Sequence, residues 1–352
     1  MIFINRIQNI KPPDQTAFFS AKKRWDSVAK PLGSFGELEL MIQKIAAIQN
    51  TDDVRIDRRT AVVFCADHGV VQEGVTQTGS EVTAICAYAI ADGTSNVNAI
   101  ADSCHADVLA VDIGMLTDVD HPKLLRRKVA YGTANLAKES AMTPEQTEKA
   151  LCIGMNIVRD LKKQGIPLLI TGEMGIGNTT PTSALASVLL NQSPREVTGR
   201  GAGLSTEALE RKMHVIEQAI AHHQPDKNYP LDLLAKLGGL EIAGMTGLFL
   251  GGAYYQIPVV IDGVISAVSA VLACQLNPLC AEYMLPSHVS EEPAGKHLLE
   301  MIHLSPVIHA GLRLGEGTGG LLLLPLLDSA LALYRNSHKF EEIAIERYTE
   351  QS

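Results

Sequence analysis

The 352-residue sequence is poor in several kinds of residue, and each scarcity excludes a class of protein. Its six cysteines include no C-x-x-C pair, which argues against a disulfide or zinc framework and indicates reduced thiols in a cytoplasmic protein. The 30 Lys and Arg residues are outnumbered by 39 Asp and Glu residues, so we expect no basic face for nucleic acid. The N-terminus has no basic segment followed by an apolar core, so we expect no signal peptide.

One stretch lacks charge altogether. Residues 242–261 are uncharged and long enough to span a bilayer. They contain several glycines, a Gln and a Pro, and Glu241 and Asp262 bound them closely. We therefore expect a buried helix that leads into a buried strand, and no membrane partner; a membrane span is the alternative.

Short apolar runs that each end in Asp, Glu or Gly predict buried strands. The runs are TAVVFCADHG (60–69), DVLAVDIG (107–114), IPLLITGE (166–173) and IPVVIDG (257–263). Near-continuous apolar strands are typical of a parallel sheet covered by helices on both faces. The fold class predicted is α/β, with a doubly wound, Rossmann-like three-layer arrangement around a parallel sheet.

Apolar residues at helical spacing lie between these runs. One stripe is Leu209, Met213, Ile216 and Ile220, and another is Leu38, Met41, Ile42 and Ile45. Ser34 and Glu37 have the spacing of a capping box at the start of the second stripe. Residues 1–30 and 321–352 read as helices without strands, so we expect a small helical domain from both termini beside a large α/β domain, 31–320.

Polar residues follow the expected strands. They are Asp67, His68, Asp112, Glu173 and Asp262. Taken singly, each could be a turn or cap residue, but the carboxyl ends of parallel strands share one edge, where open α/β sheets bind ligands. The shared pattern therefore favours one polar rim.

The stretch TGEMGIGNTTPTSALA (171–186) has the glycines and hydroxyls of a phosphate cradle and no lysine. Thr180 suits an N-cap and Pro181 the first helical position, so backbone N–H groups would point from a helix N-terminus at an anion. The G-x-x-G-x-G spacing matches neither the Walker loop nor the dinucleotide fingerprint. We expect a monophosphate ester and no metal; a tight turn without ligand is the alternative.

Two further glycine-rich loops are GRGAGLS (199–205) and LRLGEGTGG (312–320). In the second, glycines on both sides of Glu316 would let the backbone approach a ligand closely. A carboxylate among neutral neighbours is a candidate general base, although an isolated Glu of this kind is by default an exposed loop residue.

These motifs carry a resemblance to a known family. The blocks are KPLGSFGELE (30–39), ADHGVVQEGVTQTGSEVTA (66–84), GTANLAKESAMT (132–143), GEMGIGNTTPTSA (172–184), GRGAG (199–203), GGLEIAGMTG (238–247), PVVIDGVISA (258–267) and LRLGEGTGG (312–320). In order and content they resemble the nicotinate-nucleotide:dimethylbenzimidazole phosphoribosyltransferases of cobamide biosynthesis. The resemblance implies transfer of the 5-phosphoribosyl group of nicotinate mononucleotide to a lower-ligand base, with no cofactor, by a dimer with a small helical domain.

The resemblance also implies roles for individual residues. Glu316 would be the general base, and Glu173 would stabilise positive charge near C1′ of the ribose. The phosphate and nucleotide site would comprise Gly175, Gly177, Asn178, Thr179, Thr180, Lys212, Gly201 and Gly203. Lys212 could equally be a solvated helix lysine. The base site would comprise Thr78, Ser80, Cys86 and Leu314.

The sequence also departs from the family pattern. Ala202 stands where Thr is usual, Gly244 where Ala is common, and 287–297 is looser than usual. Benzimidazole-using relatives carry a Ser near Thr78 and a Gln near Cys86, and a thiol is a weak donor. The acceptor could therefore be dimethylbenzimidazole or a phenol such as p-cresol, with a homodimer or a heterodimer of paralogous subunits. A catalytically silent subunit of such a heterodimer is the rival interpretation.

Overall fold

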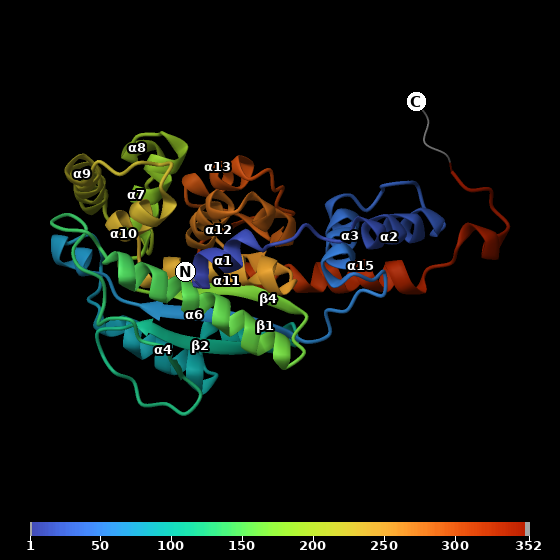
Figure 1. Cartoon of the computed structure of the whole chain (residues 1–352), viewed down its shortest axis with the longest axis horizontal. Coiled ribbons are helices and arrows are strands. Elements are labelled where there is room, and N and C mark those ends of the chain that lie inside the picture. The colour runs from blue at the N-terminus through green and yellow to red at the C-terminus, as the bar shows by residue number, and fades with distance from the viewer. Residues whose placement is uncertain (1, 349–352) are drawn as a thin grey trace.

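The structure is a computed structural model that describes residues 2–348, built around a six-stranded, entirely parallel sheet (Figure 1). Across the sheet the strands are β3 (Leu125–Arg126), β2 (Asp107–Gly114), β1 (Arg59–Ala66), β4 (Leu168–Met174), β5 (Val259–Ile261) and β6 (Met284–Pro286). The strand order reverses between β1 and β4, as in Rossmann folds, and ligands bind open sheets at such a switch point. A second, two-stranded sheet pairs β7 (His288–Ser290) with β8 (Ile308–Leu312).

Alternate side chains of β1 enter two different cores, as expected of a sheet covered on both faces. Val62 and Phe64 belong to one cluster of buried residues. Ala61, Val63 and Cys65 belong to the other. All eight residues of β1 are buried, which explains why the strand is continuously apolar from Ala61 to Ala66. The predicted fold class is confirmed.

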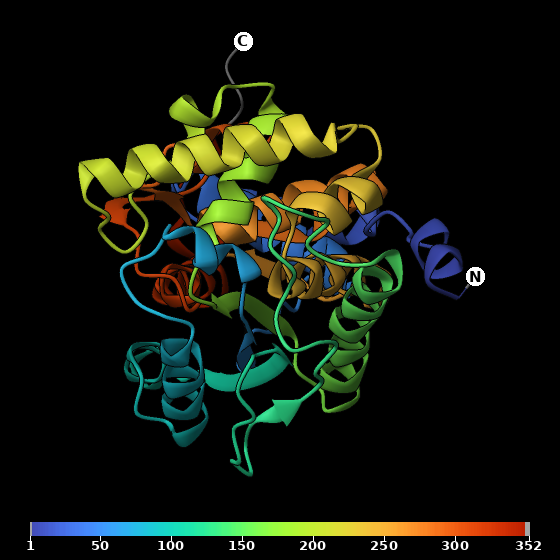
Figure 2. The same ribbon diagram turned by 90° about the vertical axis from the view of Figure 1, so that its left-hand side faces the viewer.

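Helices fill both layers. The Val62 face is covered by α1 (Ile2–Gln8), α6 (Pro144–Lys163), α7 (Thr179–Leu190), α8 (Pro194–Val197), α9 (Thr206–His223), α10 (Pro230–Leu237), α11 (Leu240–Tyr255), α12 (Val264–Leu276) and α13 (Ala294–Met301). The Val63 face is covered by α2 (Gln15–Ser27), α3 (Glu37–Gln49), α4 (Glu81–Asp92), α5 (Asn96–Ser103), α14 (Thr318–Leu321) and α15 (Leu324–Asn336). Short 3-10 turns are η1 (Gly69–Glu73), η2 (Pro278–Tyr283) and η3 (Phe340–Ile343). In the side view, the long yellow-green helix α9 lies at the opposite end of the picture from β3 (Figure 2).

The uncharged stretch after Glu241 forms α11 and then β5, so the expectation of a buried helix leading into a buried strand is confirmed. Glycines let α11 pack closely against α6. A Cβ on Gly154 would lie 2.6 Å from the amide nitrogen of Leu248, and one on Gly247 would lie 2.8 Å from Cα of Leu151. Among residues 2–348, no helix is both long and apolar enough to cross a membrane.

Helices from both ends of the chain lie together at one side of the molecule, where α2, α3 and α15 pack side by side (Figure 1). The fully buried Trp25 stacks on Tyr334 with ring centroids 5.1 Å apart. Arg59 of β1 forms a bidentate ion pair with Asp328 of α15 at 2.9 Å, which ties this group to the sheet. The division at residues 31 and 320 stays a prediction.

The structure differs from the sequence-based expectation at the starts of two helices. Helix α3 begins after Gly36, which has a φ of 56° and ends a turn that contains Ser34. The expected capping box between Ser34 and Glu37 therefore does not form. Helix α7 begins at Thr179, with Asn178 at the N-cap. Thr180 and Pro181 are therefore the second and third residues of the helix, and not its N-cap and first residue as expected. In both cases a glycine with positive φ, Gly36 or Gly177, sets where the helix starts.

Candidate active site

A cavity of about 310 Å³ lies at the carboxyl ends of β4 and β5, beside the switch point of the sheet. Its walls come from segments far apart in the sequence. They are residues 75–78, 172–179, 200–202, 262–266 and 313–316, with His288, Ser290 and Glu292. Four acidic residues, Glu173, Asp262, Glu292 and Glu316, therefore line one space.

One end of the cavity has the features of an anion site. The loop from Gly175 to Asn178 leads directly into α7, so the N-terminus of this helix, a favourable place for an anion, lies at this end. Lys212 approaches the same loop from α9. Its side chain is completely buried, and Nζ donates to Oγ1 of Thr179 at 2.8 Å and to the Gly199 carbonyl at 3.4 Å.

The burial of Lys212 excludes one of the two interpretations that the sequence left open, and its role at the phosphate stays a prediction. A solvated helix lysine would be exposed, whereas this ammonium is fully enclosed next to the glycine-rich loop. Burial lowers the pKa of Lys212 to about 8, because the charged form loses its hydration. An anion bound at the loop would supply the missing counter-charge.

Glu292 is a residue of this end of the cavity that sequence reasoning missed. Its Oε1 accepts a hydrogen bond from the backbone N–H of Gly201 at 2.9 Å, and its charge partly opposes the lowering of the Lys212 pKa by burial. The Glu292 carboxylate thus binds the backbone N–H of Gly201, a residue that the family resemblance assigns to the nucleotide site. Only the looser segment 287–297 hinted at a special function here.

Glu173, at the end of β4, has an unusual electrostatic environment. Burial raises its pKa to about 8, and the carboxylates of Asp262, Glu241 and Glu316 add to this effect. Its one hydrogen-bond donor among the described residues is the side-chain amide of Asn178. Glu173 therefore holds its proton more tightly than an ordinary Glu does.

Glu316 faces Glu173 from the loop before α14. Its Oε2 accepts a hydrogen bond from the backbone N–H of Val97, at the start of α5, at 3.2 Å. Burial raises the pKa of Glu316, while this hydrogen bond and one from the Asn96 side chain oppose the rise. No sequence motif connected residues 96–97 with Glu316.

The other predicted site residues divide into two groups. Those that line the cavity are Gly175, Gly177, Asn178, Thr179, Gly201, Thr78 and Leu314, together with Glu173 and Glu316. Those that lie outside its lining are Thr180, Lys212, Gly203, Ser80 and Cys86. Thr180 is fully buried within α7, and Gly203 accepts a hydrogen bond from Gln77 through its carbonyl. Cys86 is half-buried on α4, where burial and the charge of Glu316 raise the thiol pKa.

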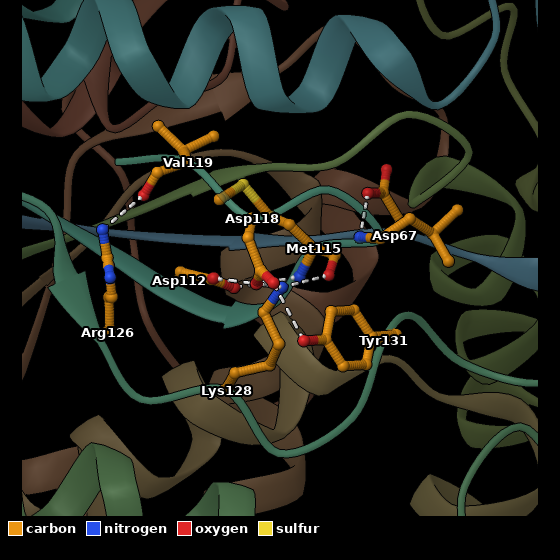
Figure 3. A network of polar contacts seen from close by, with 9 residues as sticks. Asp67, Asp112, Met115, Asp118, Val119, Arg126, Lys128 and Tyr131 are labelled. Carbon is orange, nitrogen blue, oxygen red and sulfur yellow. Dashed lines mark hydrogen bonds and ion pairs between the residues drawn. The ribbon is translucent and has the colours of Figure 1, made fainter. Parts of the chain in front are cut away.

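The expected convergence of all strand-end residues on one rim is wrong for Asp67 and Asp112 (Figure 3). Asp67 Oδ2 accepts from the backbone N–H of Leu116 at 2.8 Å, and Asp112 Oδ1 accepts from that of Met115 at 3.0 Å. Lys128 lies 3.4 Å from Asp112 and also bonds to Asp118 at 2.7 Å. These carboxylates hold the loop after β2 in place, and that loop covers them.

His68 is also diverted from the cavity. Its Nε2 lies 3.0 Å from Oε1 of Glu241 at the start of α11, and both side chains are completely buried. A Cβ on Gly239 would lie 2.6 Å from the imidazole, and one on Gly175 would lie 3.4 Å from it. The His68–Glu241 pair is therefore packed between α11 and the glycine-rich loop, and its role is structural.

Comparison with known proteins identifies the chain as a member of one family. A family model described as phosphoribosyltransferase matches residues 10–345. Among its relatives are the nicotinate-nucleotide–dimethylbenzimidazole phosphoribosyltransferases of Acetivibrio thermocellus, 42% identical over 94% of both chains, and of Ruminiclostridium cellulolyticum, 41% identical over 99% of both. The crystal structure of CobT from Thermus thermophilus superposes with a TM-score of 0.89, at 38% identity, over 95% of this chain and 100% of that one. The chain belongs to the nicotinate-nucleotide–dimethylbenzimidazole phosphoribosyltransferase family and is a phosphoribosyl-transferring enzyme.

Proposed function

We propose that this enzyme transfers the 5-phosphoribosyl group of nicotinate mononucleotide to dimethylbenzimidazole. The products are an α-ribosyl-base 5′-phosphate and nicotinate, in cobamide biosynthesis. The observation that carries the proposal is one cavity with a glycine-rich loop at one end and the carboxylates of Glu173 and Glu316 in its wall, with the buried ammonium of Lys212 bonded to Thr179 of that loop. The names of the relatives support the same substrates.

The reaction needs little from the protein beyond placement and charge. The C1′–N bond to the pyridinium breaks as a ring nitrogen of the base bonds to C1′ from the opposite face, so the β-configuration becomes α. The electron pair of the broken bond stays with nicotinate. Glu316, as its carboxylate, accepts the proton from the other nitrogen of the attacking base.

Glu173 would act on the positive charge that develops at C1′. Its pKa of about 8 means that its protonated form predominates near neutral pH. The substrate's pyridinium brings a positive charge close to Glu173 and favours its ionised form. Substrate binding would thus create the carboxylate at the moment when a negative charge is useful.

The identity of the acceptor base is inferred from the part of the cavity wall that includes Thr78 and Leu314. Burial and the charge of Glu316 raise the pKa of the Cys86 thiol, so Cys86 lies near the proposed proton acceptor. A thiol is, however, a weak hydrogen-bond donor to an azole nitrogen. Losing one neutral hydrogen bond changes affinity by about 1 kcal/mol, so selectivity should be relaxed and not reversed. We therefore expect slow use of a phenol such as p-cresol as well.

The test uses the purified chain alone, with nicotinate mononucleotide and equal concentrations of dimethylbenzimidazole and p-cresol, in EDTA. Nicotinate release with the α-ribosyl benzimidazole as main product is expected. Product only from p-cresol would overturn the proposed acceptor. No nicotinate release until a second subunit is added would favour the rival proposal, a catalytically silent member of a heterodimer.

A further inference from the structure

The turn that carries Glu316 has an unfavourable backbone conformation. Gly315, Glu316 and Gly317 have φ values of 83°, 61° and 89°, so three consecutive residues lie in the left-handed region. Glycine tolerates this region, whereas a glutamate there is strained unless its surroundings hold it. The turn also lies directly on β4, since a Cβ on Gly172 would be 2.6 Å from the Glu316 carbonyl oxygen.

Asp262 supplies that hold from the end of β5. Its Oδ1 accepts the backbone N–H of Gly320 at 2.8 Å, and its Oδ2 accepts that of Gly317 at 3.2 Å. Both carboxylate oxygens are therefore engaged by the segment that follows Glu316. The side chain is only 4% exposed, so these bonds lie away from solvent.

Asp262 is itself fixed to the sheet. Its backbone N–H donates to Oγ of Ser266 at 3.2 Å, and that hydroxyl lies 2.6 Å from Oγ1 of Thr171 on β4. The contacts link two adjacent strands to the turn. Glu316 is then held on two sides: Asp262 binds the backbone N–H of the next residue, Gly317, and α5 binds the Glu316 carboxylate.

We propose that Asp262 is a positioning residue for the reaction: its carboxylate fixes the left-handed turn so that the Glu316 carboxylate meets the attacking base. The proposal rests on the general-base role of Glu316 proposed above. A carboxylate is required because the turn presents two N–H groups. An amide would accept from one and direct its own NH₂ at the other.

The first test is Asp262→Asn, which keeps the side chain's volume. We expect kcat to fall about 10–100-fold, the consequence of a misplaced catalytic group, with KM for nicotinate mononucleotide nearly unchanged. In a Glu316→Gln background, the same substitution should cost almost nothing further, because residues that act as a unit are not additive. A rise in KM at constant kcat, or two losses that multiply, would overturn the proposal.

The pH profile gives a readout that a loss of packing would not produce. Glu316 is faced by Asp262, Glu173 of β4, Cys86 of α4 and Asn96 of α5, with Arg313 and His288 in the same cavity wall. Besides burial, the charge of Asp262 raises the pKa of Glu316, whereas the hydrogen bond from Asn96 lowers it. Asp262→Asn should therefore move the acidic limb of kcat/KM to lower pH, and Asn96→Ala should move it to higher pH. Shifts in the same direction would contradict the assignment.

Hydrogen exchange tests the same proposal without activity. In Asp262→Asn, amides of the segment 313–321 should exchange faster while the strands of the sheet keep their protection. Glu39→Gln is the control. Glu39 lies in α3, is as buried as Asp262 and pairs with Lys30 at 2.6 Å. Unchanged exchange in 313–321 would refute the role of Asp262. Normal turnover in Glu316→Gln would instead refute the general-base role on which the proposal rests.

Discussion

The two halves of the sheet's carboxyl edge begin from the same sequence pattern and end in different environments. On one half, Asp67 and Asp112 lie at the carboxyl ends of β1 and β2 and are covered by the loop that they hold (Figure 3). On the other half, Glu173 and Asp262 lie at the carboxyl ends of β4 and β5 and line the cavity. An acid after a buried strand thus marks the edge of the sheet but not which part of that edge binds a ligand.

The difference lies in the partners of the carboxylates. Burial raises the pKa of Asp112, but a backbone amide and a lysine oppose the rise and pair with its carboxylate. Glu173 has one side-chain amide and three neighbouring carboxylates, and no cation among the described residues forms an ion pair with it. An acid paired with a lysine helps to hold the fold together, whereas an acid in a cavity with a raised pKa and no such partner is typical of a functional site.

The largest expected effect concerns the open half. Glu316→Gln should lower kcat by about 10²–10⁴-fold, the usual contribution of a positioned general base, while stability and substrate KM change little. Steady-state kinetics at saturating nicotinate mononucleotide measure this. Glu207→Gln, on the exposed surface of α9, is the control. A rate close to that of the wild type would remove Glu316 from the mechanism.

The second prediction concerns the anion end of the open half. Lys212→Met should raise KM for nicotinate mononucleotide about 10–100-fold, because a charge-assisted hydrogen bond contributes about 1.5–3 kcal/mol. Nicotinate riboside, which lacks the phosphate, should be a poor substrate for both proteins and should not distinguish them. Since the Lys212 pKa is about 8, wild-type affinity should also weaken as pH rises above 8. An equal loss with the riboside would place Lys212 elsewhere.

The covered half should respond in stability. Asp112→Asn should lower the free energy of unfolding by about 1.5–3 kcal/mol, because a buried charged hydrogen-bond network around Lys128 is broken, with kcat nearly unchanged. Urea unfolding measures this, and Asp118→Asn, which alters the exposed partner of the same lysine, should have the smaller effect. Loss of activity without loss of stability would mean that Asp112 belongs with the cavity after all.

The last prediction is a pH dependence of stability on the open half. Burial raises the pKa of Glu173 from 4.5 to about 8, so between these values the folded protein binds more protons than the unfolded chain. The stability that this proton provides is complete below pH 4.5 and is lost as pH rises towards 8. Urea unfolding from about pH 5 to 8 should show a weaker decline in Glu173→Gln. Identical slopes in both proteins would contradict the high pKa.

The sequence predicted much of the cavity because its parts are local. Each glycine-rich loop joins a strand or turn to a helix start within a few residues, and Glu173 and Glu316 are embedded in two of these loops. Lys212 was predicted only through the family resemblance, since one helical lysine resembles another until its burial is known. Val97, Asn96 and Glu292 were missed because their contacts with Glu316 and Gly201 join segments about 90 or more residues apart.

The spacing of apolar residues along the chain was enough to predict the layers. Successive side chains of a strand point to opposite faces of the sheet, so a strand that is apolar throughout must have a core on each face. Local glycines and polar residues were likewise enough to specify the sharp turns after β4 and before α14. Which acids stay open to a ligand was decided only when the chain folded. Lys128 reaches Asp112 from a loop that closes over β2, while no cation among the described residues reaches Glu173. Electrostatic pairing depends on distances between segments remote in sequence, and those distances exist only in the folded molecule.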